Sequence, residues 1–353
     1  QGEVLNDFDV AGLARVNVDQ FYGIEIDEWP ARIAEVAMWL MDHLMNNDLS
    51  EKLGRYFARL PLAKAPHILQ ANALRTDWKA LLPPQECSFI MGNPPFVGQT
   101  FRTDEQNQEV RDVFGDVRLV NSIDYVACWY VKAADYMKGH KDKAVRCAFV
   151  STNSITQGEQ VEPIWRTLLD RGVVIHFAHR TFKWASEARG KAHVSVVIVG
   201  FGLSDHAPKY IFDYSDDGDP IVYTAKNINP YLIDAPSTIL VASRTSPICP
   251  APRMDYGNKP TDDANFILTA AEKDELVAKE PEAAQFIRPY IGSVEFINGK
   301  IRYCLWLKDA SPVELKKCPS ILERLDRIRD FRLKSTAKPT REKADTPQLF
   351  FYS

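Results

Sequence analysis

The chain has 353 residues, of which 45% are apolar and 25% are charged, and its formal net charge is −4. This length and composition suit a globular protein of two domains, or of one large domain with an appendage. The slight acidity excludes a polycation, so any nucleic-acid surface must be a local patch, and the lack of a run of about 18 apolar residues argues against a membrane span.

Predicted strands and helices alternate over the first two thirds of the chain. Strands are expected at 18–27, 67–78, 86–93, 145–155, 173–182 and 193–202. Helices are expected where apolar residues recur at helical spacing, at 27–46, 121–138 and 159–172. This alternation predicts an α/β domain with a largely parallel sheet. The strand at 193–202 follows its predecessor without a helix, so it is expected to pair antiparallel.

From about residue 236 the pattern changes to dense Pro, Ser and Gly turns. Three further elements are expected: a helix pair at 271–290 around Pro281, a hairpin at 292–307 turning at Asn298-Gly299, and a basic amphipathic helix at 319–335. The chain is therefore predicted to divide into an α/β domain at 1–240 and a mixed α+β domain at 241–353.

Two polar features close predicted strands, which is where open α/β sheets bind ligands. Glu25, with Asp27, ends GIEID, and an acid there can accept both hydroxyls of a nucleoside ribose; a helix-capping or surface acid is the alternative. Asn93-Pro94-Pro95-Phe96 ends FIMGN, and its two prolines can continue neither a strand nor a helix. A plain strand terminator is the alternative for this motif.

An asparagine held rigidly before two prolines offers two acceptors at one spot, its side-chain oxygen and the Pro94 carbonyl. The ring of Phe96 lies beside them in sequence. This set suits a planar substrate with an exocyclic amino group. Both amine hydrogens can be bound, the nitrogen lone pair is drawn out of ring conjugation, and the ring stacks on Phe96.

These residues lie in stretches that resemble a known family. GIEID followed by NPPF is similar to the class I S-adenosylmethionine-dependent DNA amino-methyltransferases, whose (D/N/S)-P-P-(Y/F) motif takes this Asn form in the adenine-N6 enzymes. Six stretches resemble the MmeI-like branch of type IIL/IIG restriction-modification proteins: FYGIEIDEWPARIAEVAMWLMDHL, ANALRTDW, FIMGNPPFVG, FVSTNSITQGEQV, HRTFKWASEARGKAHVSVVIVGF and GSVEFINGKIRYCLWL. The resemblance covers nearly the whole chain. It implies a Rossmann-like methyltransferase domain, followed by part of a target recognition domain.

The resemblance also implies roles for particular residues. Glu25 would bind the cofactor ribose, Ile26 would pack on its adenine, and Asn72 would accept a hydrogen bond from the adenine's amino group, where many relatives have an acid. The catalytic group would be Asn93, Pro94, Pro95 and Phe96, with Asn93 also next to the cofactor. Phe182 would be the second aromatic against a flipped adenine of duplex DNA; a core phenylalanine is the alternative. Flipping costs a few kcal/mol and stacking returns roughly 1–3 kcal/mol per base, so two ring contacts would about offset it.

Basic residues suggest two DNA-contacting regions. Within 314–343 there are ten Lys/Arg against five Asp/Glu. The helix residues proposed for phosphate contacts are Arg324, Arg327, Arg329, Arg332 and Lys334, with a solvated helix face as the alternative. Stronger candidates flank the predicted base pocket: Arg180, Lys183, Arg189 and Lys191.

Some features depart from the family or argue against other sites. The glycine-rich cofactor loop and the first strand are absent, which puts cofactor binding by this polypeptide alone in question. His176 and His179 are not expected to bind a metal, because their spacing on a strand places them on opposite faces. The six cysteines show no CxxC pair, which argues against a zinc site or disulfide framework and fits a reducing, prokaryotic cytoplasm.

The leading interpretation is a DNA adenine-N6 methyltransferase that uses S-adenosylmethionine. Its partners would be double-stranded DNA and the nuclease and helical domains of the same parent polypeptide, with no membrane. Methylation of RNA or of a protein glutamine is an alternative, since NPPY/F serves those substrates too. A DNA-reading subunit that has lost catalysis is another; the intact NPPF argues against it.

Overall fold

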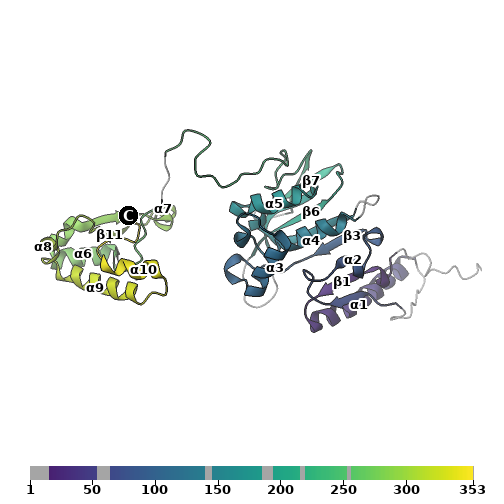
Figure 1. Ribbon diagram of the computed structural model, residues 1–353, viewed down its shortest axis with the longest axis horizontal. Coiled ribbons are helices and arrows are strands. Elements are labelled where there is room, and N and C mark those ends of the chain that lie inside the picture. The colour runs from purple at the N-terminus through teal and green to yellow at the C-terminus, as the bar shows by residue number, and fades with distance from the viewer. Residues whose placement is uncertain are drawn as a thin grey trace, which may run out of the picture. The chain divides into compact units, whose positions relative to one another are not determined.

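The chain forms two units, which are described separately. The computed structural model describes residues 16–53, 64–139, 145–184, 194–214, 219–252 and 256–352. The units are Gln1–Thr245 and Ser246–Ser353, and each has its own cluster of buried apolar side chains. Figure 1 shows the elements of both units.

A six-stranded sheet forms the centre of the first unit. Its order is β3 (Phe89–Gly92), β4 (Arg146–Thr152), β6 (Val194–Gly202), β5 (Val174–Trp184), β7 (Lys209–Asp213) and β8 (Ile221–Ala225). β3 pairs parallel with β4 and β5 pairs parallel with β7, whereas β6 is antiparallel to both of its neighbours. The prediction of an α/β domain, with an antiparallel strand where no helix intervenes, is confirmed.

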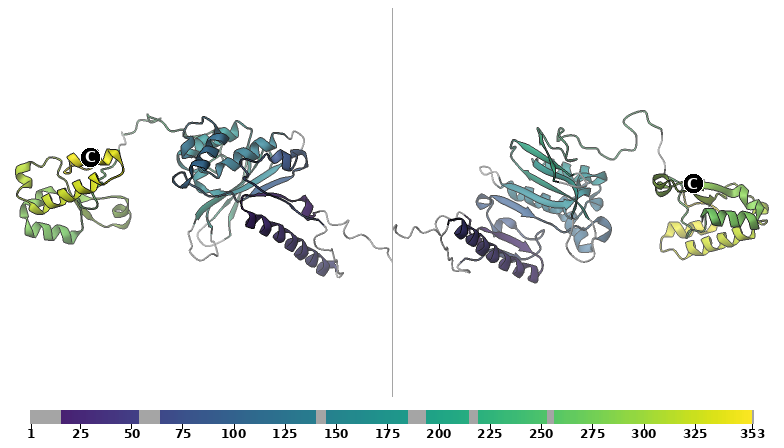
Figure 2. Two further views of the ribbon diagram at one scale, coloured as in Figure 1. Left: turned by 60° about the horizontal axis from the view of Figure 1, so that its bottom comes forward. Right: turned by 180° about the vertical axis from the view of Figure 1, so that it is seen from behind.

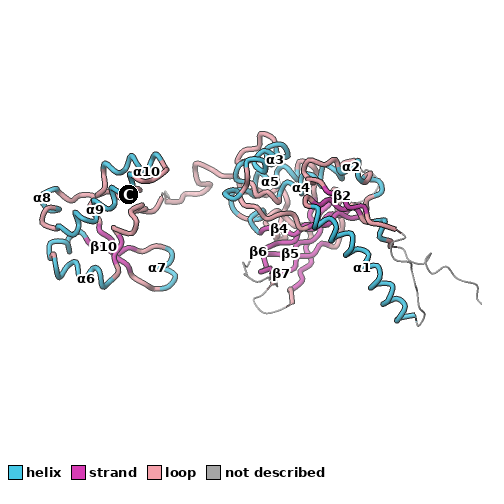
Figure 3. The backbone as a smooth tube through the Cα atoms, turned by 90° about the horizontal axis from the view of Figure 1, so that it is seen from below, coloured by secondary structure: helices cyan, strands magenta, loops and turns pink. Residues whose placement is uncertain are grey.

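Helices α3 (Asp104–Phe114), α4 (Ala127–Met137) and α5 (Val161–Leu169) lie together on one face of this sheet, as Figure 3 shows. Tyr130 of α4 is fully buried, stacks on Phe201 with ring centroids 5.1 Å apart, and forms a 2.7 Å hydrogen bond between its hydroxyl and the Ser151 hydroxyl. The indole of Trp165 donates to the Ile155 carbonyl at 2.7 Å. These buried polar atoms are therefore paired, as a tight core requires.

A smaller parallel sheet precedes the large one. It consists of β1 (Tyr22–Glu25) and β2 (His67–Gln70), which pair with each other and with no other described strand. Helix α1 (Glu28–Leu53) lies along this sheet (Figure 2), and helix α2 (Trp78–Leu81) follows β2. The apolar stripe of α1 was predicted from its spacing, yet Ile33 is 63% exposed, and Met91 on the edge strand β3 is 78% exposed. Apolar surface therefore remains uncovered on both sides of the break between the sheets.

The second unit is a small antiparallel sheet with surrounding helices. The strands β9 (Ile267–Leu268), β10 (Ile287–Tyr290) and β11 (Arg302–Leu305) take the order β10-β11-β9. The helices are α6 (Ala270–Lys279), α7 (Ser293–Asn298), α8 (Pro312–Leu315), α9 (Pro319–Leu333) and α10 (Lys338–Glu342). The basic helix expected at 319–335 is present as α9. In the described parts of both units, no helix is long and apolar enough to cross a membrane.

Two predictions for this unit were wrong. The expected hairpin at 292–307 is helix α7 followed by β11, because Gly292 and Glu295 cap the helix start and Gly299, at φ 63°, ends it. Asn-Gly therefore acts here as a left-handed helix terminus rather than a hairpin turn. The second member of the helix pair at 271–290 is a 3-10 turn, Pro281–Phe286, that leads into strand β10.

Candidate active site

The loop after β3 presents two unpaired acceptors on a fixed backbone. Asn93 is exposed and Pro94 is buried. Neither the Asn93 amide nor the Pro94 carbonyl forms a hydrogen bond with any residue that the structure describes. Phe96 is half-buried against the core, and the next residue, Val97, accepts a 3.1 Å hydrogen bond from the Tyr125 N–H. The segment that carries the two acceptors is thus held by β3 on one side and by the bond to Tyr125 on the other, while neither acceptor receives a hydrogen bond from a described residue.

A buried aspartate lies behind this loop. Asp124 accepts hydrogen bonds from the Thr152 hydroxyl at 3.0 Å and from the Ser154 hydroxyl, and its own N–H donates to Gln160 at 2.8 Å. It therefore joins the end of β4 to the segment that holds Val97. Sequence reasoning missed Asp124, because the helix predicted at 121–138 included it, whereas α4 begins only at Ala127.

The end of β1 offers a free carboxylate. Glu25 is exposed and has no side-chain partner among the described residues, while its carbonyl accepts a 2.8 Å bond from the Ala71 N–H. Ile26, the next residue, is 63% exposed. These two residues therefore fit a nucleoside: the Glu25 carboxylate can accept hydrogen bonds from the two ribose hydroxyls, and the Ile26 side chain beside it offers an apolar surface to a planar base.

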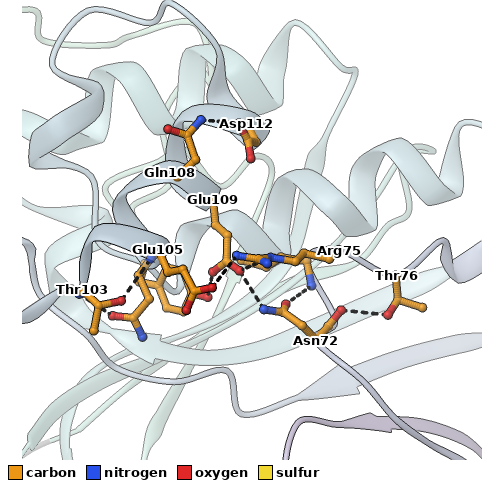
Figure 4. Close-up of polar contacts among 11 residues, drawn as sticks. Asn72, Arg75, Thr76, Thr103, Glu105, Gln108, Glu109 and Asp112 are labelled. Carbon is orange, nitrogen blue, oxygen red and sulfur yellow. Dashed lines mark hydrogen bonds and ion pairs between the residues drawn. The ribbon is translucent and has the colours of Figure 1, made fainter.

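Asn72 lies in a polar network that the sequence did not reveal (Figure 4). Its Nδ2 donates to Glu109 at 2.7 Å, and its Oδ1 accepts from the Leu74 N–H at 2.9 Å. Glu109 is only 5% exposed and also accepts from Arg75 Nε at 2.7 Å and from the Tyr125 hydroxyl. This hydrogen bond from Arg75 raises the pKa of its guanidinium, and burial raises the pKa of Tyr125. Both groups accordingly remain donors at neutral pH.

Phe182 stands at the far end of β5 among other rings. It lies 4.8 Å from Tyr214 between ring centroids, and the Tyr214 hydroxyl is 2.6 Å from His179 Nδ1. His179 in turn stacks on Phe212 at 4.2 Å, and burial lowers its pKa. These contacts hold Phe182 in place from one side.

Asn93 and Phe182 extend beyond the same end of the sheet but are not in contact. The parallel and antiparallel pairings make β3 and β5 point in one direction, with β4 and β6 between them. Three intervals of about 4.8 Å separate the two strands by roughly 14 Å. The strand ends that carry the predicted base-binding residues thus point the same way but lie too far apart for Asn93 and Phe182 to touch.

The basic residues predicted to contact DNA have unequal surroundings. Arg180 is paired with Asp213 at 2.7 Å, and Lys183 is exposed, whereas Arg189 and Lys191 lie outside the described residues. On α9, Arg324 donates to the Asn265 carbonyl at 3.0 Å and is mostly buried. The remaining exposed guanidinium groups of this helix are Arg327, paired with Glu323, and Arg329.

The prediction that Arg332 lies on the surface of α9 was wrong. It was grouped with the surface cations of α9, but it is fully buried and donates to five backbone carbonyls. Arg332 lies four residues after buried Ile328 and seven after buried Leu325, so it shares their face of the helix and its charge points inward. Arg332 therefore organises the second unit and offers no group to a phosphate.

Comparisons with known proteins match most of the chain in two parts. The model of the MmeI DNA-methyltransferase domain matches residues 2–213, and that of the MmeI target recognition domain matches residues 235–353. DNA methyltransferase A of Bacillus subtilis (strain 168) is 40% identical over 339 residues, which cover 95% of this chain and 38% of that protein. The Type IIL restriction-modification enzyme MmeI, solved in complex with DNA, is similar with a TM-score of 0.85 and 50% identity, over 97% of this chain and 45% of that one. The chain thus spans less than half the length of either relative.

Proposed function

Because the chain belongs to the MmeI family, with its DNA-methyltransferase and target recognition domains, we propose that it forms the catalytic and sequence-reading part of a site-specific DNA methyltransferase. The family resemblance and the fold class predicted from the sequence are confirmed. The proposed reaction transfers a methyl group to the N6 amino group of a flipped adenine in duplex DNA. The observation that carries this proposal is the pair of unused acceptors at Asn93 and Pro94.

The first unit has residues suited to S-adenosylmethionine. The free Glu25 carboxylate would accept from the ribose hydroxyls, exposed Ile26 would cover the adenine, and Asn72 would accept from its amino group. When bound, the cofactor supplies a methyl group activated by an adjacent sulfonium. The protein residues orient that group and exclude water around it, and alignment of this kind can supply most of a rate enhancement.

The target base would be held through its amino group. The Asn93 side-chain oxygen and the Pro94 carbonyl accept one amine hydrogen each, which leaves the nitrogen lone pair directed away from the ring plane. Phe96 stacks on the base, and Phe182 limits the space from the β5 side. No described residue has to act as a general base, because the amine loses its proton after the transfer.

DNA would be bound by both units. In the first, Arg180 and Lys183 would contact the DNA backbone, and the same role is proposed for Arg189 and Lys191, which lie outside the described residues. In the second, Arg327 and Arg329 are the exposed cations of α9, while the contacts of Arg324 within its own unit leave it a smaller part. The nuclease and helical domains of a restriction-modification polypeptide are the proposed further partners.

The test compares the gene-length protein with an Asn93→Ala variant. Each is incubated with unmethylated duplex DNA and S-adenosylmethionine labelled in the methyl group, and the DNA is digested to nucleosides. We expect label in N6-methyladenine, reduced about 100-fold or more in the variant, because a misplaced reacting group costs on that order. Asn121→Ala is the matched control, since that side chain is exposed and only its backbone carbonyl is used, by Arg102.

Three results would contradict parts of this proposal. Label in methylcytosine refutes the adenine assignment alone. Equal labelling by wild type and Asn93→Ala refutes the role of the loop. No label in DNA, with cofactor still bound, refutes DNA methylation and directs the search to RNA and protein glutamine acceptors.

A further inference from the structure

Glu109 is a buried carboxylate that connects three separate segments. It lies in the middle of α3, a helix inserted between the loop after β3 and α4. One oxygen accepts from Asn72 Nδ2 and from Arg75 Nε, each at 2.7 Å, and the other accepts from the Tyr125 hydroxyl. Figure 4 shows Asn72 and Arg75 converging on the Glu109 carboxylate. Burial of an acid is tolerated only with such pairing.

On the β2 side, Glu109 determines which way the Asn72 amide faces. An ionised carboxylate can only accept hydrogen bonds, so the NH₂ group of Asn72 must point toward it. The Leu74 N–H can only donate, so it requires the Asn72 oxygen at the opposite end. The two contacts together exclude the flipped amide. The Asn72 oxygen keeps one lone pair beyond its bond to Leu74.

On the β3 side, Glu109 reaches the loop of Asn93 through Tyr125. The Tyr125 hydroxyl donates to Glu109, and its backbone N–H donates to the Val97 carbonyl at 3.1 Å. The residue before it is Asp124, which joins the end of β4. One carboxylate thus ties the segment after β2 to the segment after β3.

We propose that Glu109 is a positioning residue that orients the Asn72 amide, so that its oxygen accepts from the cofactor's adenine, and that couples this orientation to the loop of Asn93. This inference rests on the proposed function for the identity of the cofactor. It deepens that function because it makes a residue of helix α3 control the orientation of Asn72, the proposed acceptor for the cofactor's adenine.

The first test is cofactor affinity, measured by equilibrium binding of S-adenosylmethionine to the gene-length protein without DNA. Glu109→Gln can turn its own NH₂ toward Asn72 and permits the amide flip, so affinity should fall about 10-fold. Glu105→Gln is the matched control: it lies one turn earlier on α3, is 79% exposed, and touches only the outer side of Arg75 at 3.4 Å. Its affinity should stay within about 2-fold of wild type.

An exchange of the two groups separates orientation from general packing. Asn72→Asp places two carboxylates against each other without a donor, so it should also weaken binding. The double variant Asn72→Asp/Glu109→Gln restores one donor and one acceptor in reversed order, and it leaves an oxygen facing Leu74. The new NH₂ group also faces Arg75 Nε, which shared the Glu109 oxygen with Asn72, so affinity should recover in part and exceed that of Asn72→Asp alone. Thermal unfolding without cofactor should show the same non-additivity.

The outcomes are distinct from those of the methylation assay. Unchanged affinity in Glu109→Gln overturns the inference, as does a double variant whose losses simply add. Should Glu109→Gln fail to fold, the comparison of Asn72→Asp with the double variant still decides it, since orientation predicts recovery of both folding and binding. Cofactor binding with no methyl transfer to DNA refutes only the proposed function, whereas a wild type that binds no cofactor refutes both.

Discussion

Replacing Arg332 by methionine should strongly destabilise the second unit. The guanidinium is fully buried and donates at 2.8–3.2 Å to backbone carbonyls from two distant segments. These acceptors are Pro260, Thr261, Lys343, Thr346 and Leu349. Methionine has a similar reach but no donor, so all of these carbonyls lose their partner together.

The expected loss is large relative to the stability of a domain. Each buried group left unsatisfied costs about 1–3 kcal/mol, and part of this is offset because the buried charge is removed as well. A net loss of roughly 3–5 kcal/mol is expected for a broken buried network. Domains are stable by only about 5–15 kcal/mol, so the loss removes a large share of the unit's stability and unfolds it outright at the low end of that range.

Hydrogen exchange with mass spectrometry on the whole chain measures this directly. Peptides from α9 and β11 should lose protection in Arg332→Met, while peptides from β4 and β6 in the first unit serve as an internal reference. Arg329→Met, on the exposed side of the same helix, should exchange like wild type. Unaltered protection of α9 in Arg332→Met would show that the carbonyl network contributes little and would refute the reasoning.

Two further predictions concern the first unit. Gly200→Ala would place a Cβ 2.1 Å from the Phe177 ring, so overpacking should cost β6 about 1–3 kcal/mol of stability, measured by its hydrogen exchange. Gly257→Ala is the control, because a Cβ there would meet nothing within 4 Å. Equal effects of the two substitutions would contradict the close approach. Burial lowers the pKa of His179, so the unfolded chain binds a proton more readily, and the urea midpoint should fall as the pH drops from about 6.5 toward 5.5. His179→Gln, which can still hydrogen bond to Tyr214, should flatten that decline, and an identical slope would exclude His179 as its cause.

The local features of this protein were readable from the sequence. Hydrophobic period identified α1, α4 and α5, and the missing helix before 193–202 predicted the antiparallel β6. The prolines of the motif at 93–96 predicted a stiff loop at a strand end. Such features arise from backbone sterics and side-chain spacing within a few residues, so they need no knowledge of the rest of the chain.

The tertiary structure alone decided where buried charges lie and which local signal prevails. Glu109 sits in the polar sequence DEQNQEVRDVF, where no helix was predicted, and Arg332 sits in the basic sequence ERLDRIRDFRL, which is typical of a solvated helix face. Their partners come from 11 to 72 positions away, so burial depends on packing that no short window contains. Asn298-Gly299 suits both a hairpin and a helix end, and in the structure Gly299 ends α7 while β11 pairs with β10 and β9 rather than with residues 292–298. Local chemistry thus specifies elements and strand-end motifs, whereas long-range packing determines which charged groups leave water and what they hold.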